Sequence, residues 1–414
     1  MKRADVKHRD EGSSYHPYLR WIEEQLPHSL SLLKSWANTN SYTNNLEGLA
    51  IQLSLLKEEF SKLGGKQQVL SLPPRIVVDK EGKLSKIPVG QALTIRKRPE
   101  APIQVLLAGH MDTVYPPSSS FQTVIETNTQ SWVGPGVTDM KGGLIVLYTA
   151  LATLERTPFA HQIGWEVIIN PDEEVGSVSS ESLFLEAAQR HQVGLIFEPA
   201  FHDGYFVRSR KGSANYTIVT QGQAAHAGRD FSQGKSAIYA LAHFIQELEK
   251  FNDPELGLNV NVGFIQGGGP VNIVPDFALC KINIRSCEAA KMQTFQRTLE
   301  GIAHSCMTRE GIRFGITQET FRLPKPFDQK TEQLFNQIAQ VADELQIPFQ
   351  WRDSGGVCDG NILSHAGLAT IDSLGVVGGH LHTHAEYIDL YSLTQRAQLT
   401  ALYLMKLATK ELYV

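Results

Sequence analysis

Five segments of this chain end an apolar run, or fill a glycine-rich turn, with histidine or carboxylate side chains. They read VLLAGHMD, GPGVTDMKGG, VIINPDEE, GLIFEP and GGHLHTH, and they are spread over residues 105–384. An open α/β sheet collects its ligands beyond the carboxyl ends of its strands, so these side chains are expected to meet at one site. The pattern therefore favours a mixed α/β sheet covered by helices.

Apolar runs and helical periodicities alternate from residue 103 onward. Residues 103–110, 164–174 and 193–200 are predicted strands, and residues 141–155 and 179–191 are predicted helices between them. This alternation is typical of a mixed sheet with flanking helices.

A different pattern follows, and a chain of 414 residues is long enough for two domains. Alternating strands and two amphipathic helices predict a small α+β domain with antiparallel strands over residues 210–321. Residues 321–329 read as a linker, after which a helix and a strand are expected to rejoin the first sheet. We therefore expect a main domain formed by residues 1–209 and 322–414, with residues 210–321 inserted into it.

Composition excludes several partners. The net charge of −5 does not suggest binding to nucleic acid or to an anionic membrane surface. The first twenty residues contain no apolar run typical of a secretory signal, and the apolar stretch 142–154 is too short to span a bilayer. The four cysteines lack C-x-x-C spacing, so we expect free thiols in a reducing compartment, with a cytoplasmic location.

The polar residues at the predicted strand ends are of metal-ligating types. Two imidazoles and three carboxylates without thiolates suit zinc or a similar divalent ion, and they suffice for two ions if one carboxylate bridges. A spare carboxylate beside them would serve as general base. Taken singly, each residue has a plainer interpretation as a turn, a helix cap or a solvated charge. Their recurrence favours the metal site, whose candidates are His110, Asp112, Asp139, Glu173, Glu174, Glu198 and His382.

Together these motifs resemble the di-zinc metallopeptidase family that includes glutamate carboxypeptidase, acetylornithine deacetylase, succinyl-diaminopimelate desuccinylase and aminoacylase. The resemblance runs from about residue 100 to about residue 395, and HMDTVY and GPGVTDMKGG are most similar to the glutamate carboxypeptidase branch. It implies a zinc exopeptidase-like catalytic domain for the main domain and a lid and dimerisation domain for residues 210–321.

The resemblance also implies roles for the candidate residues. One zinc ion would be held by His110 and Glu198, the other by Glu174 and His382, with Asp139 bridging the two. The resemblance further implies that the peptide bond after the bridging aspartate is cis.

Two carboxylates would act beside the ligands. Asp112 would hold the imidazole of His110 in one tautomer, and Glu173 would be the general base. His380 and His384 compete with His382 for the last ligand position, but the preceding glycines and the following EYIDL favour His382.

In the inserted domain, the segment GQAAHAG resembles the motif whose histidine, here His226, reaches the neighbouring subunit's active site and stabilises an oxyanion. Asn272 and Arg285 correspond to substrate-binding positions, and an arginine fork suits a carboxylate. The alternatives are that His226 is a strand-end histidine and that Arg285 is an exposed strand charge. A homodimer through the lid domain is implied by the resemblance alone.

The expected activity is metal-dependent amide hydrolysis of the exopeptidase type. By resemblance, a zinc-bridged hydroxide would release a C-terminal amino acid, with glutamate the expected one, from a small peptide or an N-acyl amino acid. An N-acyl-amino-acid deacylase with the same site and a catalytically inactive binding homologue are the alternatives. Cobalt or manganese could replace zinc. Cys358 has no assigned role and is expected to be a small buried residue.

Overall fold

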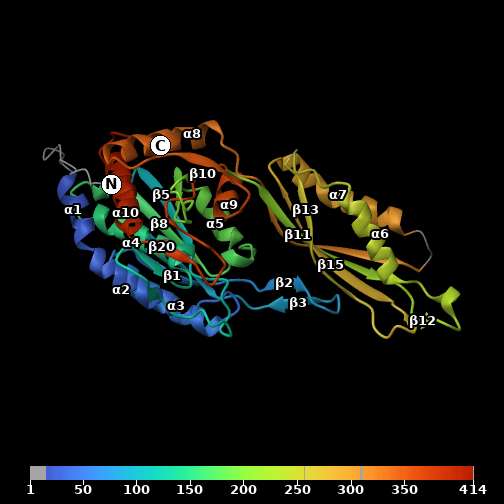
Figure 1. Cartoon of the computed structure of the whole chain (residues 1–414). Helices are drawn as coiled ribbons and strands as arrows, with labels where there is room; N and C mark the ends of the chain where they lie inside the picture. Colours follow the sequence, from blue (N-terminus) through green and yellow to red (C-terminus); the bar gives the residue numbers. More distant parts are fainter. Residues whose placement is uncertain (1–14, 256, 308–310, 414) are drawn as a thin grey trace, which may run out of the picture.

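The structure is a computed structural model, and it describes residues 15–255, 257–307 and 311–413. Two bodies are visible in Figure 1, each built on its own sheet. We refer to the body with the six-stranded sheet as the main domain and to the body with the four-stranded antiparallel sheet as the lid domain. The expectation that no secretory signal is present concerns a segment largely outside the described residues.

The main-domain sheet has the strand order β1-β4-β8-β5-β9-β18. Strands β8, β5, β9 and β18 run parallel to one another, whereas β4 pairs antiparallel with both β8 and β1. The bounds are β1 Lys66–Ser71, β4 Gln91–Lys97, β5 Ile103–His110, β8 Ile163–Asn170, β9 Val193–Ile196 and β18 Ala369–Ile371. Because β5, β8 and β9 are parallel neighbours, their carboxyl ends lie at one edge of the sheet.

Helices cover both faces of this sheet (Figure 1). Along β5, Val105 and Leu107 pack into the large core that includes α4, while Leu106 and Ala108 face α5 and α9. A strand buried on both faces needs apolar residues at every position, which explains the uninterrupted VLLA run. The bounds are α1 His16–Glu24, α2 Leu26–Ala37, α3 Leu46–Ser61, α4 Gly142–Glu155, α5 Glu181–Ala188, α8 Gln329–Glu344, α9 Asp359–His365 and α10 Tyr391–Ala408.

Among the described residues, one helical stretch, Val137–Glu155, is long and apolar enough to cross a membrane. Burial inside the main domain accounts for its composition, since 94% of its apolar window is covered by the rest of the protein.

The lid-domain sheet has the order β13-β15-β11-β16 with antiparallel pairing throughout. Helices α6 and α7 pack on one face, against alternate residues such as Ile218, Cys280 and Ile282. The residues between them point to the helix-free face. The bounds are β11 Gly212–Gln221, α6 Ala237–Glu249, β13 Asn259–Gly267, β15 Phe277–Ser286, α7 Ala289–Cys306 and β16 Arg313–Arg322.

Short strands complete the two domains. In the main domain, β19-β20-β7-β6 form a small sheet and β10 pairs with β17, while β12 pairs with β14 at the end of the lid domain remote from the main domain (Figure 1). The bounds are β6 Ile125–Glu126, β7 Ser131–Val133, β10 Phe206–Arg210, β12 Ala225–His226, β14 Ile273–Val274, β17 Trp351–Ser354, β19 Gly378–Gly379 and β20 Tyr387–Asp389.

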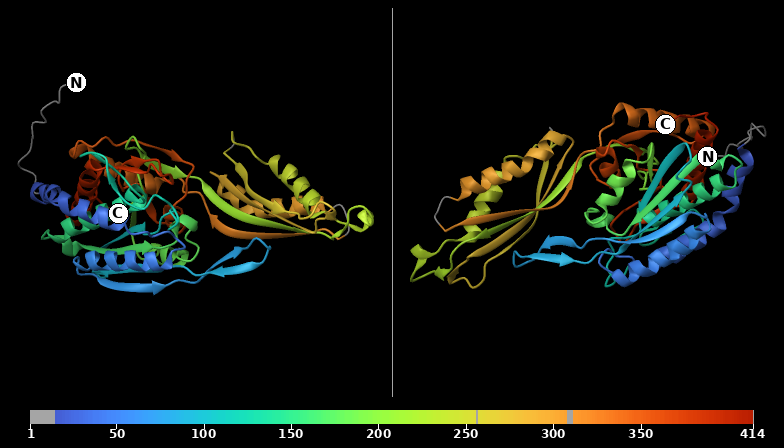
Figure 2. Two further views of the ribbon diagram at one scale, coloured as in Figure 1. Left: turned by 60° about the horizontal axis from the view of Figure 1, so that its bottom comes forward. Right: turned by 180° about the vertical axis from the view of Figure 1, so that it is seen from behind.

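A hairpin of the main domain, β2 Arg75–Val78 with β3 Leu84–Ile87, reaches across to the helix-free face of the lid sheet. Figure 2 shows it beside that sheet in both views. Val78 packs there against Val219 and Leu279, and it is 3% exposed. The hairpin is therefore a second connection between the domains, besides the chain crossings at β11 and β16.

The predicted fold class, a mixed α/β sheet with flanking helices plus a separate α+β domain, is confirmed. One local expectation is wrong. The segment read as a linker from residue 321 starts inside β16, which continues to Arg322.

Candidate metal centre

The predicted metal ligands lie around Asp139, which is one of them. His110 Nε2 lies 3.1 Å from Asp139 Oδ1 and 3.8 Å from Glu198 Oε1. His382 Nε2 lies 3.3 Å from Asp139 Oδ2 and 3.3 Å from Glu174 Oε2. Each oxygen of Asp139 therefore faces a different imidazole, which is the arrangement that a bridging carboxylate requires.

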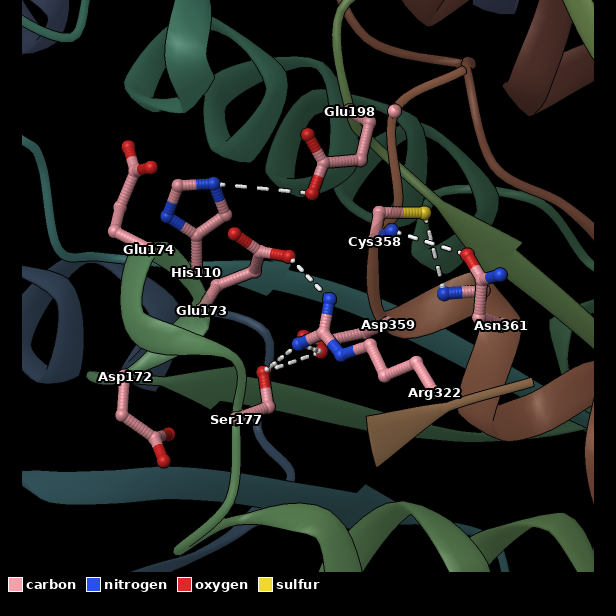
Figure 3. Close-up of polar contacts among 12 residues, drawn as sticks. His110, Asp172, Glu173, Glu174, Ser177, Glu198, Arg322, Cys358, Asp359 and Asn361 are labelled. Atoms are coloured by element: carbon pink, nitrogen blue, oxygen red, sulfur yellow. Dashed lines mark hydrogen bonds and ion pairs between the residues drawn. The ribbon is translucent and has the colours of Figure 1, made fainter. Parts of the chain in front are cut away.

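The fold explains this convergence. His110 ends β5, Glu173 and Glu174 follow β8, and Glu198 follows β9, so all four come from the same edge of the parallel part of the sheet. Figure 3 shows His110, Glu173 and Glu198 directed toward one another from these strand ends. Asp139 lies in the turn before α4, where the Asp139–Met140 peptide bond is cis as expected.

The centre concentrates negative charge in a buried space. Burial and the neighbouring Asp139 raise the pKa of Glu174 to about 8, and burial raises the pKa of Glu198 well above its usual range. Burial opposes the charged form of His110, but hydrogen bonds with Asp112 and Asp139 raise its pKa well above normal. Among the predicted ligands, only the imidazoles of His110 and His382 can carry a positive charge that balances these carboxylates.

These residues fit a divalent cation. Glu174 Oε1 is buried and has no hydrogen-bond partner among the described residues, so one strong acceptor is left for an ion. Ligand atoms of His110, Asp139 and Glu174 lie within 4.8 Å of one another, and so do those of His110, Glu173 and Glu198. Neutral imidazoles and carboxylates are ligands that zinc accepts, and binding would release the protons that now balance the charge.

Asp112 is placed to orient both a ligand and the loop that carries Glu173 and Glu174. Its Oδ1 lies 3.3 Å from His110 Nδ1, and its backbone oxygen lies 3.0 Å from the same nitrogen. Its carboxylate also accepts the backbone N–H groups of Glu173 and Glu174, each at 3.2 Å, and the hydroxyl of Thr43 at 2.7 Å. Acceptors at Nδ1 leave Nε2 of a neutral His110 free to bind a metal.

Sequence reasoning missed Glu386, which holds the turn around Asp139. Its carboxylate accepts three backbone N–H groups, from Gly136 at 3.0 Å, Thr138 at 2.9 Å and Asp139 at 3.0 Å. The hydroxyl of Tyr115 lies 2.8 Å from its Oε2. The EYIDL motif that selected His382 contains this residue, so its carboxylate was the available signal.

Sequence reasoning also missed Arg322, a buried residue at the end of β16. It donates to Glu173 Oε1 at 2.9 Å, to Ser177 Oγ at 2.7 Å and to Asp359 Oδ1 at 3.1 Å (Figure 3). Burial opposes its charge, but Glu173 and Asp359 raise its pKa. Arg322 thereby fixes Glu173 from the lid side of the centre. No local motif distinguishes it, because its partners are far away in the sequence.

Two cavities flank the centre. One of about 570 Å³ is lined by Asp139, Glu198, Arg210 and His382, on the side of the β9 loop. The other, of about 470 Å³, lies between Glu173, Glu174 and the helix-free face of the lid sheet, and we call it the lid-side cavity. Either volume is in the range of small-molecule sites.

Arg285 lies in the lid-side cavity. Its guanidinium donates to the backbone oxygen of Gly355 at 2.6 Å and to Asn283 Oδ1 at 3.0 Å, and burial lowers its pKa. It has no carboxylate partner among the described residues. The structure therefore brings Arg285 to the centre within a single chain.

His226 and Asn272 are not brought to the centre of their own chain. Both are exposed, and they lie beside the β12–β14 pair at the remote end of the lid domain (Figure 1). His226 Nδ1 accepts the backbone N–H groups of Gly228 at 3.1 Å and Arg229 at 3.2 Å. A neutral His226 thus carries its proton on Nε2, where it is available to an outside acceptor.

The two competing histidines have neighbours outside the predicted ligand set, and His380 also lines the cavity of about 570 Å³. His384 stacks on Phe121 and lies 3.1 Å from Ser119 Oγ, while the ring of His380 packs beside Tyr387. Cys358 is buried, as expected, and its sulfur accepts the N–H of Gly360 at the start of α9. All four cysteines are free thiols.

A cluster of carboxylates and imidazoles at the strand ends of such a sheet is typical of a metal-dependent enzyme. Comparison with known proteins agrees: the model of Peptidase family M20/M25/M40 matches residues 106–406, and the chain belongs to this family. The protein is accordingly a hydrolase acting on peptide or amide bonds, from a family that is metal-dependent and typically uses zinc.

Relatives by sequence and by structure support the assignment. Carboxypeptidase G2 of Pseudomonas sp. is 24% identical over 93% of this chain and 90% of its own length. Succinyl-diaminopimelate desuccinylase of Corynebacterium glutamicum is 26% identical over 60% of this chain and 68% of its own length. The M20 family metallo-carboxypeptidase Sso-CP2 of Sulfolobus solfataricus has the same fold, with a TM-score of 0.72 at 17% identity over 91% of this chain and 98% of that one.

Glu386→Ala is expected to weaken metal binding by about 10- to 100-fold, because three backbone N–H groups of the Asp139 turn lose their acceptor. Competition with a chelator measures the affinity. Glu386→Gln keeps one acceptor oxygen and should fall between the wild type and the alanine variant. The exposed Glu81→Ala serves as control. An unchanged affinity in Glu386→Ala would show that the turn is rigid without this residue.

Proposed function

We propose that this protein is an exopeptidase-type zinc hydrolase that releases a C-terminal amino acid, with glutamate as the expected one, from a small peptide or N-acyl amino acid. The observation that carries the proposal is the lid-side cavity, where Arg285 lies without a carboxylate partner in the same space as Glu173 and Glu174. A guanidinium so placed suits the α-carboxylate of a substrate whose amide reaches the metal centre.

Two zinc ions would occupy the centre. His110 and Glu198 would hold one, Glu174 and His382 the other, and Asp139 would be shared. Bound divalent ions supply Lewis acidity, which polarises an amide carbonyl and acidifies water. Cobalt or manganese would suit the same donor set.

The side chains of the protein divide the remaining work. Glu173 takes the proton of the attacking water and delivers it to the leaving amine. Arg322 orients Glu173 through its hydrogen bond at 2.9 Å. Arg285 holds the substrate carboxylate, so that the scissile amide is positioned before the chemical step.

A deacylase for N-acyl amino acids is the second candidate. The similarity to succinyl-diaminopimelate desuccinylase favours it. The cavity of about 570 Å³ also favours it, because this cavity would hold an acyl group beyond Glu198. Both activities need the same metal chemistry and the same carboxylate anchor, so a substrate panel separates them.

We further propose a homodimer formed through the lid domain. The edge strand β13 and helix α6 expose Phe264, Ile265, Ile238 and Tyr239, of which Tyr239 is 73% exposed. Burying such side chains against a second copy would be favourable. In such a dimer, His226 and Asn272 would reach the active site of the second copy. The proton on His226 Nε2 would then stabilise an oxyanion there.

For location, we propose a reducing compartment such as the cytoplasm. The support is the set of four free thiols, three of which, Cys280, Cys306 and Cys358, are buried.

Purified protein is expected to bind about two zinc ions per chain and to release glutamate from N-acylated or dipeptide substrates. Metal analysis and a substrate panel measure this. Activity on N-acetyl amino acids without dipeptide cleavage would favour the deacylase. Zinc without turnover on any amide would support an inactive binding homologue, and protein without affinity for zinc would overturn the whole proposal.

Glu173→Gln should retain zinc but lower kcat by about 100- to 10,000-fold, because it removes the proton acceptor and keeps the shape. Steady-state kinetics with parallel metal analysis tests this. Glu186→Gln, exposed on α5, is the matched control and should be normal. Near-normal turnover in zinc-loaded Glu173→Gln would assign the base to another group.

Mixing two inactive variants tests the dimer and His226 together. If His226 serves the neighbouring subunit, His226→Ala and Glu173→Gln homodimers are each inactive, but a mixed dimer contains one complete site. Co-expression should therefore restore activity to a fraction of the wild-type value, measured as kcat per purified heterodimer. Absence of restoration in verified heterodimers would place His226 outside the reaction.

A further inference from the structure

The β2–β3 hairpin is fixed between the two domains. Val78 packs with Val219 and Leu279 on the helix-free face of the lid sheet. The backbone N–H of Val78 donates to Glu319 Oε1 at 3.3 Å, and the ammonium of Lys281 donates to the Val78 oxygen at 3.1 Å. These contacts hold the end of β2, three residues from Arg75, at a defined place relative to the lid sheet.

The fixed hairpin forms one wall of the lid-side cavity. Arg75, Ile76 and Val77 of β2 line it together with Glu173 and Glu174 of the metal centre. Arg75, the first residue of β2, is half-buried, in contrast to the exposed cations Lys83 and Lys86 farther along the hairpin.

The opposite wall is the helix-free face of the lid sheet. Alternation along β15 directs Asn283 and Arg285 to this face, together with Lys281 and Leu279 farther out. The polar end of the face lies at the cavity, and the apolar end lies under the hairpin. The same strand thus both docks the hairpin and lines the cavity.

Two guanidinium groups in this cavity lack a counter-ion. Arg75 donates to Asn44 Oδ1 at 3.4 Å, and Arg285 donates to Gly355 and Asn283. Neither has a carboxylate within ion-pair distance among the described residues, whereas Arg322 is paired with Glu173 and Asp359. A substrate with a single carboxylate would pair with Arg285 and leave Arg75 unpaired.

We propose that Arg75 is a specificity-determining residue, which binds a second carboxylate on the side chain of the amino acid whose α-carboxylate Arg285 holds. The proposal rests on the proposed function and adds to it a residue from outside the metal motifs. It requires a substrate with an acidic residue at the released end. The hairpin supplies the recognition, and its docking on the lid sheet sets the position of the guanidinium.

The experiment compares N-benzoyl-glutamate with N-benzoyl-glutamine, which differ in charge but hardly in shape, on the zinc-loaded full-length protein. Arg75→Gln is expected to lower kcat/KM for the glutamate substrate by about 10- to 100-fold, mainly through KM, and to change the glutamine substrate by less than about 3-fold. Arg75→Lys should recover part of the loss. Lys86→Gln removes an exposed cation of the same hairpin and should leave both substrates unchanged.

Equal losses on the two substrates, or no loss on either, would overturn the role of Arg75 while leaving the proposed function in place. If neither substrate is hydrolysed, the wider panel of N-acylated and dipeptide substrates tests the proposed function, and calorimetry with free glutamate and free glutamine tests the role of Arg75 separately. Glutamate binding that is tighter than glutamine binding and is lost in Arg75→Gln supports the site. Equal affinities in wild type and variant overturn it.

Discussion

The repulsion among three buried carboxylates is the constraint on which the rest of this structure depends. Asp139, Glu174 and Glu198 lie close together in a space that raises the pKa of both glutamates. Such a cluster is unfavourable unless cations or protons balance it. The two imidazoles can balance it only as imidazolium ions, and a divalent cation does so while leaving them neutral. The charge arrangement itself therefore argues for metal, independently of any motif.

Holding these ligands together requires an outer layer of acceptors aimed at backbone N–H groups. Asp112 binds the loop of Glu173 and Glu174, and Glu386 binds the turn of Asp139. Both carboxylates bind backbone N–H groups. The position of each ligand carried by these loops is therefore set by the hydrogen bonds of its loop. This division allows the ligands to keep their remaining oxygens for the metal, as the unpartnered Glu174 Oε1 illustrates.

Much of the fold and the inner site could be predicted because the information is local. Apolar runs that end in His110 or precede Glu173 and Glu198 identify both the strand and the ligand edge. Arg322 escaped prediction because its partners Glu173 and Asp359 become neighbours only when the lid domain is in place. His226 shows the opposite case, since its motif is clear but its position in one chain is remote from the centre.

The β2–β3 hairpin shows why specificity is harder to predict than catalysis. Nothing in its sequence, PPRIVVDKEGKLSKI, indicates that Val78 packs against Val219 and Leu279. The positions of the metal ligands depend on where the strands end, and the pattern of apolar residues in the sequence indicates those ends. The place of Arg75 depends on contact between elements about 140–200 residues apart, which only the assembled domains create. Because the hairpin is held by contacts of Val78 with the lid sheet, a change at Arg75 is expected to alter substrate preference more than metal binding.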